Sequence, residues 1–199
     1  MKRALLFMPV LVLALALGAC SGSDFTLNQD EAVDPNVVSV DGVSFARPLR
    51  FLEVDRDDLA SDLSGNAMVS ELARSMRMDA AALAEVIESF DLYLARKPGR
   101  RGYADNVTVA SPGGAAPSAK DLKAQLVAVG AKNVRVGHAE TDLGRVTTGT
   151  YSLPVGTMTA QGTVIVVDAD ETLLITVTTS ARSRTKNLAK GILKTLDED

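Results

Sequence analysis

Two runs of β-branched residues near the C-terminus constrain the fold of this chain more than any other stretch. Thr163–Val167 and Thr172–Thr179 consist almost wholly of Val, Ile, Leu and Thr, and the acidic segment Asp168–Glu171 separates them. β-branched residues lose little side-chain freedom on a pleated strand, so the pattern predicts a β-hairpin. Apolar residues occupy both faces of the first run, which predicts a central strand covered on both sides. In the second run one face alternates Leu with Thr, which predicts less complete burial.

Length and composition indicate one ordinary globular domain without a nucleic-acid partner. The 199 residues are 46% hydrophobic and 23% charged, which are the proportions of a folded domain with a substantial core. Aromatic residues make up only 4% and Trp is absent, which argues against a stacking platform for nucleic-acid bases.

The first residues have the pattern of an export signal. Met1–Arg3 is positively charged, and Ala4–Leu17 is an apolar run interrupted only by Pro9. The run is shorter than the roughly 20 residues of a transmembrane helix but suits the apolar core of a signal peptide. Removal of residues 1–19 would leave 19 basic and 25 acidic residues, a net charge of −6. Such a balance disfavours non-specific binding to nucleic acid.

The end of this signal resembles a bacterial lipobox. Leu17, Gly18 and Ala19 precede Cys20, which is the single cysteine of the chain. We expect Cys20 to receive a diacylglyceryl group and palmitate-type acyl chains and to become the N-terminus of the mature protein. Acyl chains contribute about 0.8 kcal/mol per buried CH₂, so the prediction is a lipid-anchored protein on the extracytoplasmic face of the cell membrane. An ordinary secretory signal with a chance cysteine is the alternative.

A tether and a single α+β domain are expected after the lipidated cysteine. Residues 20–36 are polar, acidic and without periodicity, which predicts a flexible tether. The domain is expected to span residues 37–199, with a hairpin and a helix pair at 37–102 and the main sheet with a closing helix at 103–199. Asp41-Gly42 between Val37–Val40 and Val43–Phe45 is the strongest hairpin signal.

Helical periodicity follows this hairpin. One expected helix has Val69, Leu72 and Met76 on its apolar face. A second begins after an Asp79 cap, and its apolar face comprises Leu83, Val86, Phe90 and Leu94. The acidic stretch at residues 55–62 lacks the Gly and Glu of an EF-hand loop, so we expect a solvated loop or helix cap rather than a calcium site. The basic segment Arg96–Gly102 is expected to end the second helix in an exposed loop.

The second half predicts one strand, one helix, four strands and a closing helix. Tyr103–Val109 is the first strand, and Ser118 caps a helix whose buried stripe is Ala119, Leu122, Leu126 and Val129 and which ends at Gly130. The four strands are expected at about Asn133–Glu140, Val146–Leu153, Thr159–Val167 and Thr172–Thr179. The last helix is expected over Arg184–Leu196, with Leu188, Ile192 and Leu196 inward and Lys186, Lys190 and Lys194 in solvent.

From Tyr103 onward this order of parts resembles the actinobacterial LpqN-type lipoproteins, a branch of the PsbP-like (Mog-type) fold. The resemblance rests on the segment Ala104–Val109, the helix, four strands and closing helix that follow it, and the lipobox at the front. It implies an antiparallel sheet flanked by helices in an α/β/α sandwich. It also implies a binding or assembly module rather than an active site.

Candidate catalytic and metal-binding groups are few. His138 is the only histidine, so a site with several histidine ligands does not exist, and a lipidated Cys20 leaves no thiol nucleophile. The chain contains no Gly-x-Ser-x-Gly motif, phosphate loop or dinucleotide fingerprint. A Ser-His-Asp triad through His138 remains open because triads assemble in space. Its position in a strand-like stretch instead favours a cross-strand pair with a carboxylate.

We therefore expect a non-enzymatic binding or assembly module of the cell envelope, with no metal and no cofactor. Arg96, Lys97, Arg100 and Arg101 form the expected contact surface for an unidentified envelope protein or component. A small-ligand or lipid carrier and an envelope hydrolase with an unrecognised site are the alternatives.

Overall fold

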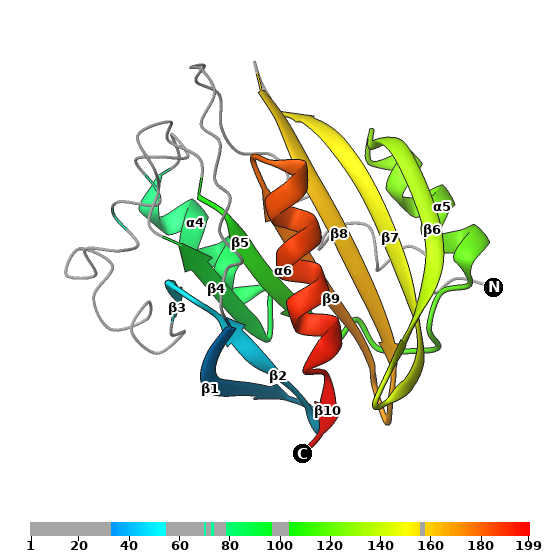
Figure 1. Ribbon diagram of the computed structural model, residues 1–199. Helices are drawn as coiled ribbons and strands as arrows, with labels where there is room; N and C mark the ends of the chain where they lie inside the picture. The colour runs from blue at the N-terminus through cyan, green and yellow to red at the C-terminus, as the bar shows by residue number, and fades with distance from the viewer. Residues whose placement is uncertain (1–32, 55–69, 71–72, 74–78, 97–103, 156–157) are drawn as a thin grey trace.

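The computed structural model describes residues 33–54, 70, 73, 79–96, 104–155 and 158–199, and these form a mixed α+β structure (Figure 1). Its strands build two antiparallel sheets, one of seven strands in the order β3-β4-β5-β9-β8-β7-β6 and one of three in the order β1-β2-β10. The strands are β1 (Val33–Val40), β2 (Val43–Pro48), β3 (Phe51–Glu53), β4 (Leu92–Arg96), β5 (Asn106–Ala110), β6 (Lys132–Thr141), β7 (Gly144–Val155), β8 (Met158–Asp168), β9 (Thr172–Thr179) and β10 (Asp197–Glu198). The helices are α4 (Ala80–Glu88), α5 (Ala119–Ala128) and α6 (Arg182–Lys194).

The β8–β9 hairpin occupies the middle of the large sheet, as its composition predicts. Val164 and Ile165 are each 0% exposed although they point to opposite faces, so both faces of the sheet are covered here. All eight residues of β9 are also buried. The expectation of less complete burial there is wrong, because β9 lies between β5 and β8 and its threonines are covered as fully as its leucines.

The N-terminal hairpin is confirmed. Val40 pairs with Val43, and Asp41 and Gly42 adopt φ angles of 48° and 77°. Positive φ at both central positions is what the favoured two-residue hairpin turn requires. Strand β1 begins at Val33, so the strand includes the last residues of the segment expected to be a tether. At the other edge of the small sheet β10 pairs with β2, which brings the C-terminus against the hairpin.

The helix predicted after Asp79 is correct at its start and wrong at its end. Asp79 caps α4, since its carboxylate accepts a hydrogen bond of 2.8 Å from the backbone N–H of Ala81. The helix stops at Glu88, however, and Phe90 and Leu94 are not part of it. Leu94 instead lies in β4, where it is 0% exposed and pairs with Val107. A spacing of four residues is an even number, so it suits a strand face as well as a helix face, and pairing with β5 decides between them.

The remaining elements follow the sequence pattern. Ser118 caps α5 by accepting a hydrogen bond from the Asp121 N–H at 3.2 Å, and Gly130 closes the helix end with φ +84°. Strands β6 to β9 coincide with the four predicted strands to within a few residues. Leu188 and Ile192 of α6 face the sheet, and Leu196 is buried just beyond the helix end. The strand predicted over Tyr103–Val109 begins later, at Asn106.

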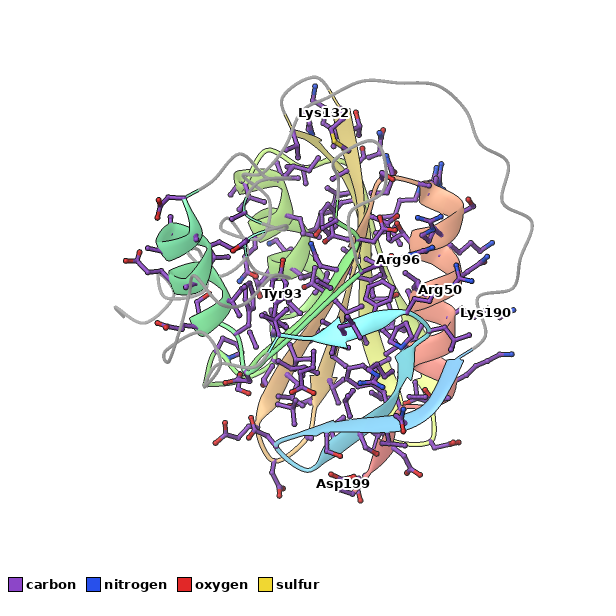
Figure 2. The ribbon with its side chains drawn as sticks, turned by 90° about the vertical axis from the view of Figure 1, so that its left-hand side faces the viewer. Arg50, Tyr93, Arg96, Lys132, Lys190 and Asp199 are labelled. Carbon is purple, nitrogen blue, oxygen red and sulfur yellow. The ribbon has the colours of Figure 1, made fainter. Side chains whose placement is uncertain are left out.

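Helices cover both faces of the large sheet, and α4 and α6 lie on opposite sides of it (Figure 2). On one face α6 and the β1–β2 hairpin bury a cluster that includes Phe45, Ile165 and Ile192. On the other face α4 packs on β4 through Leu83 and Tyr93. Helix α5 packs on β7 and β8 farther along that second face. Val69, Leu72 and Met76 of the first predicted helix, the acidic stretch at 55–62 and residues 1–32 lie outside the described residues.

Candidate functional site

Helix α6 leaves a groove between itself and strands β6, β7 and β8. The groove has a volume of about 580 Å³. It forms because α6 lies over β8 and β9, while β6 and β7 continue beyond it (Figure 1). One wall is α6 and the opposite wall is β6. The lining residues are Asn133, Arg135, Ala139, Thr148, Thr150, Tyr151, Ser152, Gln161, Gly162, Thr163, Arg182, Thr185, Lys186, Ala189, Lys190 and Leu193.

Hydroxyl groups dominate the floor of the groove. Thr148, Thr150 and Ser152 alternate along β7, so all three side chains point to the face on which α6 lies. Thr150 pairs with Thr163 of β8 on one side and with Arg135 of β6 on the other. The Ser152 hydroxyl donates to the Lys132 carbonyl and accepts from the Asn133 amide, whereas the hydroxyls of Thr148 and Thr150 can each donate and accept a hydrogen bond to a ligand. The floor can therefore bind polar groups of either kind.

Positive charge lines both walls. Arg182, Lys186 and Lys190 are spaced by four residues and so share one side of α6, and Arg135 lies on β6 across the groove. All four are exposed, and Lys190 extends from α6 toward solvent (Figure 2). None of the described lining residues is acidic, and within the described part of the chain none of the four cations forms an ion pair. Like charges at this spacing cost about 0.2–0.5 kcal/mol per pair, so the row slightly destabilises the helix.

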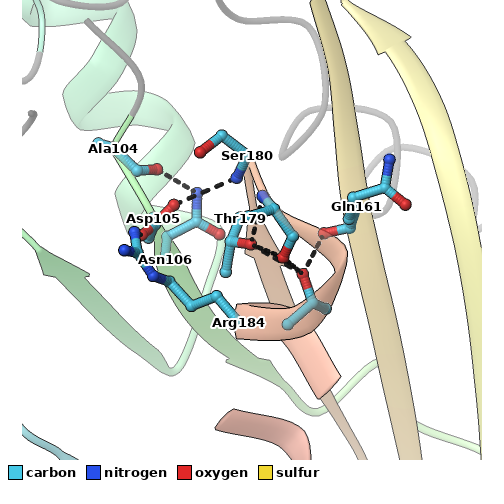
Figure 3. A network of polar contacts seen from close by, with 9 residues as sticks. Ala104, Asp105, Asn106, Gln161, Thr179, Ser180 and Arg184 are labelled. Carbon is cyan, nitrogen blue, oxygen red and sulfur yellow. Dashed lines mark hydrogen bonds and ion pairs between the residues drawn. The ribbon is translucent and has the colours of Figure 1, made fainter. Parts of the chain in front are cut away.

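A buried ion pair holds the start of α6 against the sheet (Figure 3). The Arg184 guanidinium donates to the Asp105 carboxylate at 2.6 Å, and the Asp105 side chain is only 5% exposed. The same carboxylate accepts the backbone N–H of Ser180 at 3.2 Å. Asp105, the residue before β5, thus links the start of that strand to the turn between β9 and α6. These contacts give Asp105 a structural role within the segment Ala104–Val109.

A second set of contacts fixes the first turn of α6 to β8. The Thr185 hydroxyl donates to the backbone carbonyl of Gln161 at 3.1 Å and lies 2.8 Å from the Thr179 hydroxyl (Figure 3). Ala181 supplies no side-chain cap for the helix, and the Thr179 hydroxyl accepts the Ala181 backbone N–H instead. These contacts set the position of α6 relative to the strands, and hence the width of the groove at this end.

The opposite face of the same strands is closed around Gly149 and Gly162. Leu122 and Leu126 of α5 pack so tightly over Gly149 that a Cβ added there would lie 3.3 and 3.1 Å from their methyl groups. Farther along, the Tyr151 ring lies over Gly162, where a Cβ would approach the ring to 2.1 Å. Burial raises the pKa of Tyr151 to about 12, although the nearby Thr178 hydroxyl acts in the opposite direction. The hydroxyl of Tyr151 has no hydrogen-bond partner of good geometry.

His138 does not form the pair that the sequence suggests. It lies exposed on β6, and its Nδ1 is 3.4 Å from the hydroxyl of Thr147, the residue paired with it on β7. The expected carboxylate partner is therefore wrong. The alternation of β6 places His138 on the α5 side of the sheet, away from the groove.

The basic residues predicted as a partner surface are only partly within the described structure. Arg96 ends β4, where it is half-buried and its backbone N–H donates to the Asp105 carbonyl at 3.0 Å. Lys97, Arg100 and Arg101 lie outside the described residues, as do Leu17, Gly18, Ala19 and Cys20. These residues therefore remain predictions from the sequence.

The structure brings together cations that the sequence did not connect. Lys186, Lys190 and Lys194 are exposed as expected, and two of them, Lys186 and Lys190, also line the groove. Arg135 and Arg182 were not singled out from the sequence. The spacing of Arg182, Lys186 and Lys190 is a visible signal, but it does not show which strands the helix overhangs.

The chain matches no protein-family model and no curated protein. Across the described residues, no helix is long and apolar enough to cross a membrane. The same residues contain no group of three or more His, Cys, Asp or Glu side chains that could hold a metal ion.

Proposed function

We propose that this protein is a lipid-anchored, extracytoplasmic binding module of the cell envelope that performs no catalysis. The lipobox Leu17-Gly18-Ala19-Cys20 supports the anchor, and helices on both faces of an antiparallel sheet agree with an LpqN-type domain of PsbP-like fold. Its binding surface is the groove between α6 and strands β6–β8. Its ligand is an anionic component of the envelope.

The groove's charge is the observation that supports binding most directly. Arg135, Arg182, Lys186 and Lys190 surround it, and no acidic side chain lies among its described lining residues. This concentration of cations occurs in a chain with a net charge of −4. A cleft lined by one sign of charge raises the local concentration of ligands of the opposite sign. An anionic ligand would also relieve the repulsion between the helix cations.

The alternatives have less support. A carrier of apolar ligands would not need the cations on both walls of this groove, and hydroxyl groups of Thr148, Thr150 and Thr163 line its floor beside the apolar residues. A hydrolase acting through His138 would need a neighbouring carboxylate to orient the imidazole as a base. The Nδ1 of His138 instead contacts the hydroxyl of Thr147.

Site-specific photocrosslinking tests the binding surface. A photoreactive amino acid at position 150, exposed on the groove floor, should capture an envelope component in intact cells. The same amino acid at position 123, exposed on α5, should not capture that component. Identical products at both positions, or no product at 150, would show that the groove is not the binding surface.

The anchor is tested independently by Cys20→Ala. Without acyl chains the protein should move from the membrane fraction to the soluble or unprocessed pool. A variant that still sediments fully with membranes after a high-salt wash would contradict the lipid anchor.

A further inference from the structure

The geometry points to a ligand class for the groove: we propose that it binds the phosphate ester of a polyol, as a lipid headgroup or as a free sugar or glycerol phosphate. This inference rests on the proposed function, because it names the ligand of the same groove.

The cations suit phosphate. Successive residues of a helix rise by about 1.5 Å, so Lys186 and Lys190 lie about 6 Å apart along α6, and Arg182 lies a further 6 Å away. Arginines on both walls, Arg182 on α6 and Arg135 on β6, can each donate two parallel hydrogen bonds to phosphate oxygens. A phosphate between the walls would thus meet donors from both sides.

The floor suits hydroxyl groups beside the phosphate. Thr148, Thr150 and Thr163 offer hydroxyls that donate and accept, and Gln161 adds a side-chain amide at the end near Arg182. A simple inorganic anion would use only the donors of this surface. A polyol phosphate would use both the donors and the acceptors, so it matches the floor and the walls together.

One end of the groove is apolar. Ala139 of β6 and Ala189 and Leu193 of α6 lie there, next to the apolar cluster beneath α6. They offer a short surface for the carbon skeleton of a polyol or for the first methylenes of a lipid. The volume of about 580 Å³ suits a single ligand of headgroup size.

Thermal unfolding with matched ligands tests this proposal. The full chain is studied in a neutral detergent, which keeps the N-terminus soluble whether or not it is lipidated. The probes are glycerol 1-phosphate, a short-chain phosphatidylglycerol below its micelle concentration, and short-chain phosphatidylcholine as the zwitterionic control. A ligand that binds only the folded state stabilises it by RT ln(1 + [L]/Kd), so the melting temperature rises with the logarithm of ligand concentration above Kd.

The double variant Lys186→Gln, Lys190→Gln removes two wall cations from exposed positions, so it should fold normally. We expect its Kd for the anionic probes to rise about tenfold for each lysine replaced, since hydrogen bonds to charged groups are the strong ones. Lys194→Gln removes a charge from the same helix outside the groove lining and should leave the Kd within about twofold of the original.

The outcomes separate the sources of the ligand. Stabilisation by both anionic probes assigns the affinity to the phosphate and polyol, and stabilisation by phosphatidylglycerol alone assigns it to a lipid. No stabilisation by either probe, or stabilisation retained in the double variant, overturns the proposal. If crosslinking at position 150 still captures an envelope component in that case, the binding module stands and only the ligand class is wrong.

Discussion

The two faces of strands β6 to β8 are built from the same backbone but are packed differently. On one face α5 presses Leu122 and Leu126 onto Gly149 and leaves no space for an added methyl group. On the other face α6 is held by Asp105 and Thr185 at its first turn and leaves a groove of about 580 Å³. The closed face is apolar, whereas the groove face has hydroxyls and cations.

Under the proposed function, one face of the sheet would supply stability and the other would supply binding. Packing on the α5 face buries apolar surface, which is the main source of folding free energy. The cations Arg182, Lys186 and Lys190 on the α6 face repel one another and gain nothing from an acidic partner in the described structure. A row that costs stability is expected where a ligand, rather than the fold, uses the side chains.

The largest expected effect is at the centre of the sheet, where both faces are closed. Val164→Asp and Ile165→Asp each place an unpaired carboxylate at a position that is 0% exposed, on the α5 side and on the α6 side respectively. Both should prevent folding, because an uncompensated buried charge costs more than the usual margin of stability. Circular dichroism should show no cooperative melt. A native-like melt for either variant would mean that this face is open at β8.

The next effect concerns the contacts that hold α6. Asp105→Ala should lower the free energy of unfolding by about 3 kcal/mol, because it removes the buried carboxylate that the Arg184 guanidinium contacts at 2.6 Å. Chemical denaturation measures this loss. The double variant Asp105→Ala, Arg184→Met should be less destabilised than Asp105→Ala alone, since the guanidinium that lost this carboxylate is then removed as well. Equal losses in both would show that the remaining Arg184 charge does not cause the loss.

Alanine substitutions at two glycines, one on each face, compare how tightly the two faces are packed. Gly149→Ala adds a methyl group 2.9 Å from Val164 on the closed face and should cost about 1–3 kcal/mol. Gly137→Ala adds one where nothing lies within 4 Å and should leave stability unchanged or raise it by about 0.4–1 kcal/mol. Denaturation curves of the two variants test the comparison, and similar losses in both would remove the distinction between the faces.

The smallest effect tests the repulsion along α6. Lys186→Gln removes like-charge contacts to Arg182 and Lys190 and should raise the free energy of unfolding by about 0.5 kcal/mol at low ionic strength. The gain should vanish in about 1 M salt, where charges are screened within about 3 Å. Lys132→Gln, an exposed change on β6, is the control and should show neither effect. A loss of stability in Lys186→Gln would contradict the repulsion.

Local patterns in the sequence predicted most elements, and tertiary pairing decided the exceptions. Asp41-Gly42 and the Ser118 cap are local signals, and both appear as expected. The spacing of Leu94 from Phe90 predicts a helix, but an even spacing suits a strand as well, and only the pairing of Leu94 with Val107 in β5 distinguishes the two structures.

The groove could not be predicted from the sequence either, because tertiary structure brings its residues together. Arg135 is separated from Lys186 by about fifty residues, and no periodicity connects a strand with a helix that overhangs it. The cation spacing on α6 could be seen in the sequence, but the hydroxyl floor of β7 beneath it required the register of the sheet. The lipobox is the opposite case, since it is purely local and depends on no fold.

Lysine footprinting in native membranes tests the central claim most directly. Acetylation rates of Lys186 and Lys190 are compared between intact membranes and the purified full chain in neutral detergent, with Lys120 and Lys123 of α5 as internal references. All four side chains are exposed in the structure. If the groove is the occupied face, Lys186 and Lys190 should react more slowly in membranes, whereas Lys120 and Lys123 should react equally in both. Equal rates for all four lysines in membranes and in detergent would contradict the account.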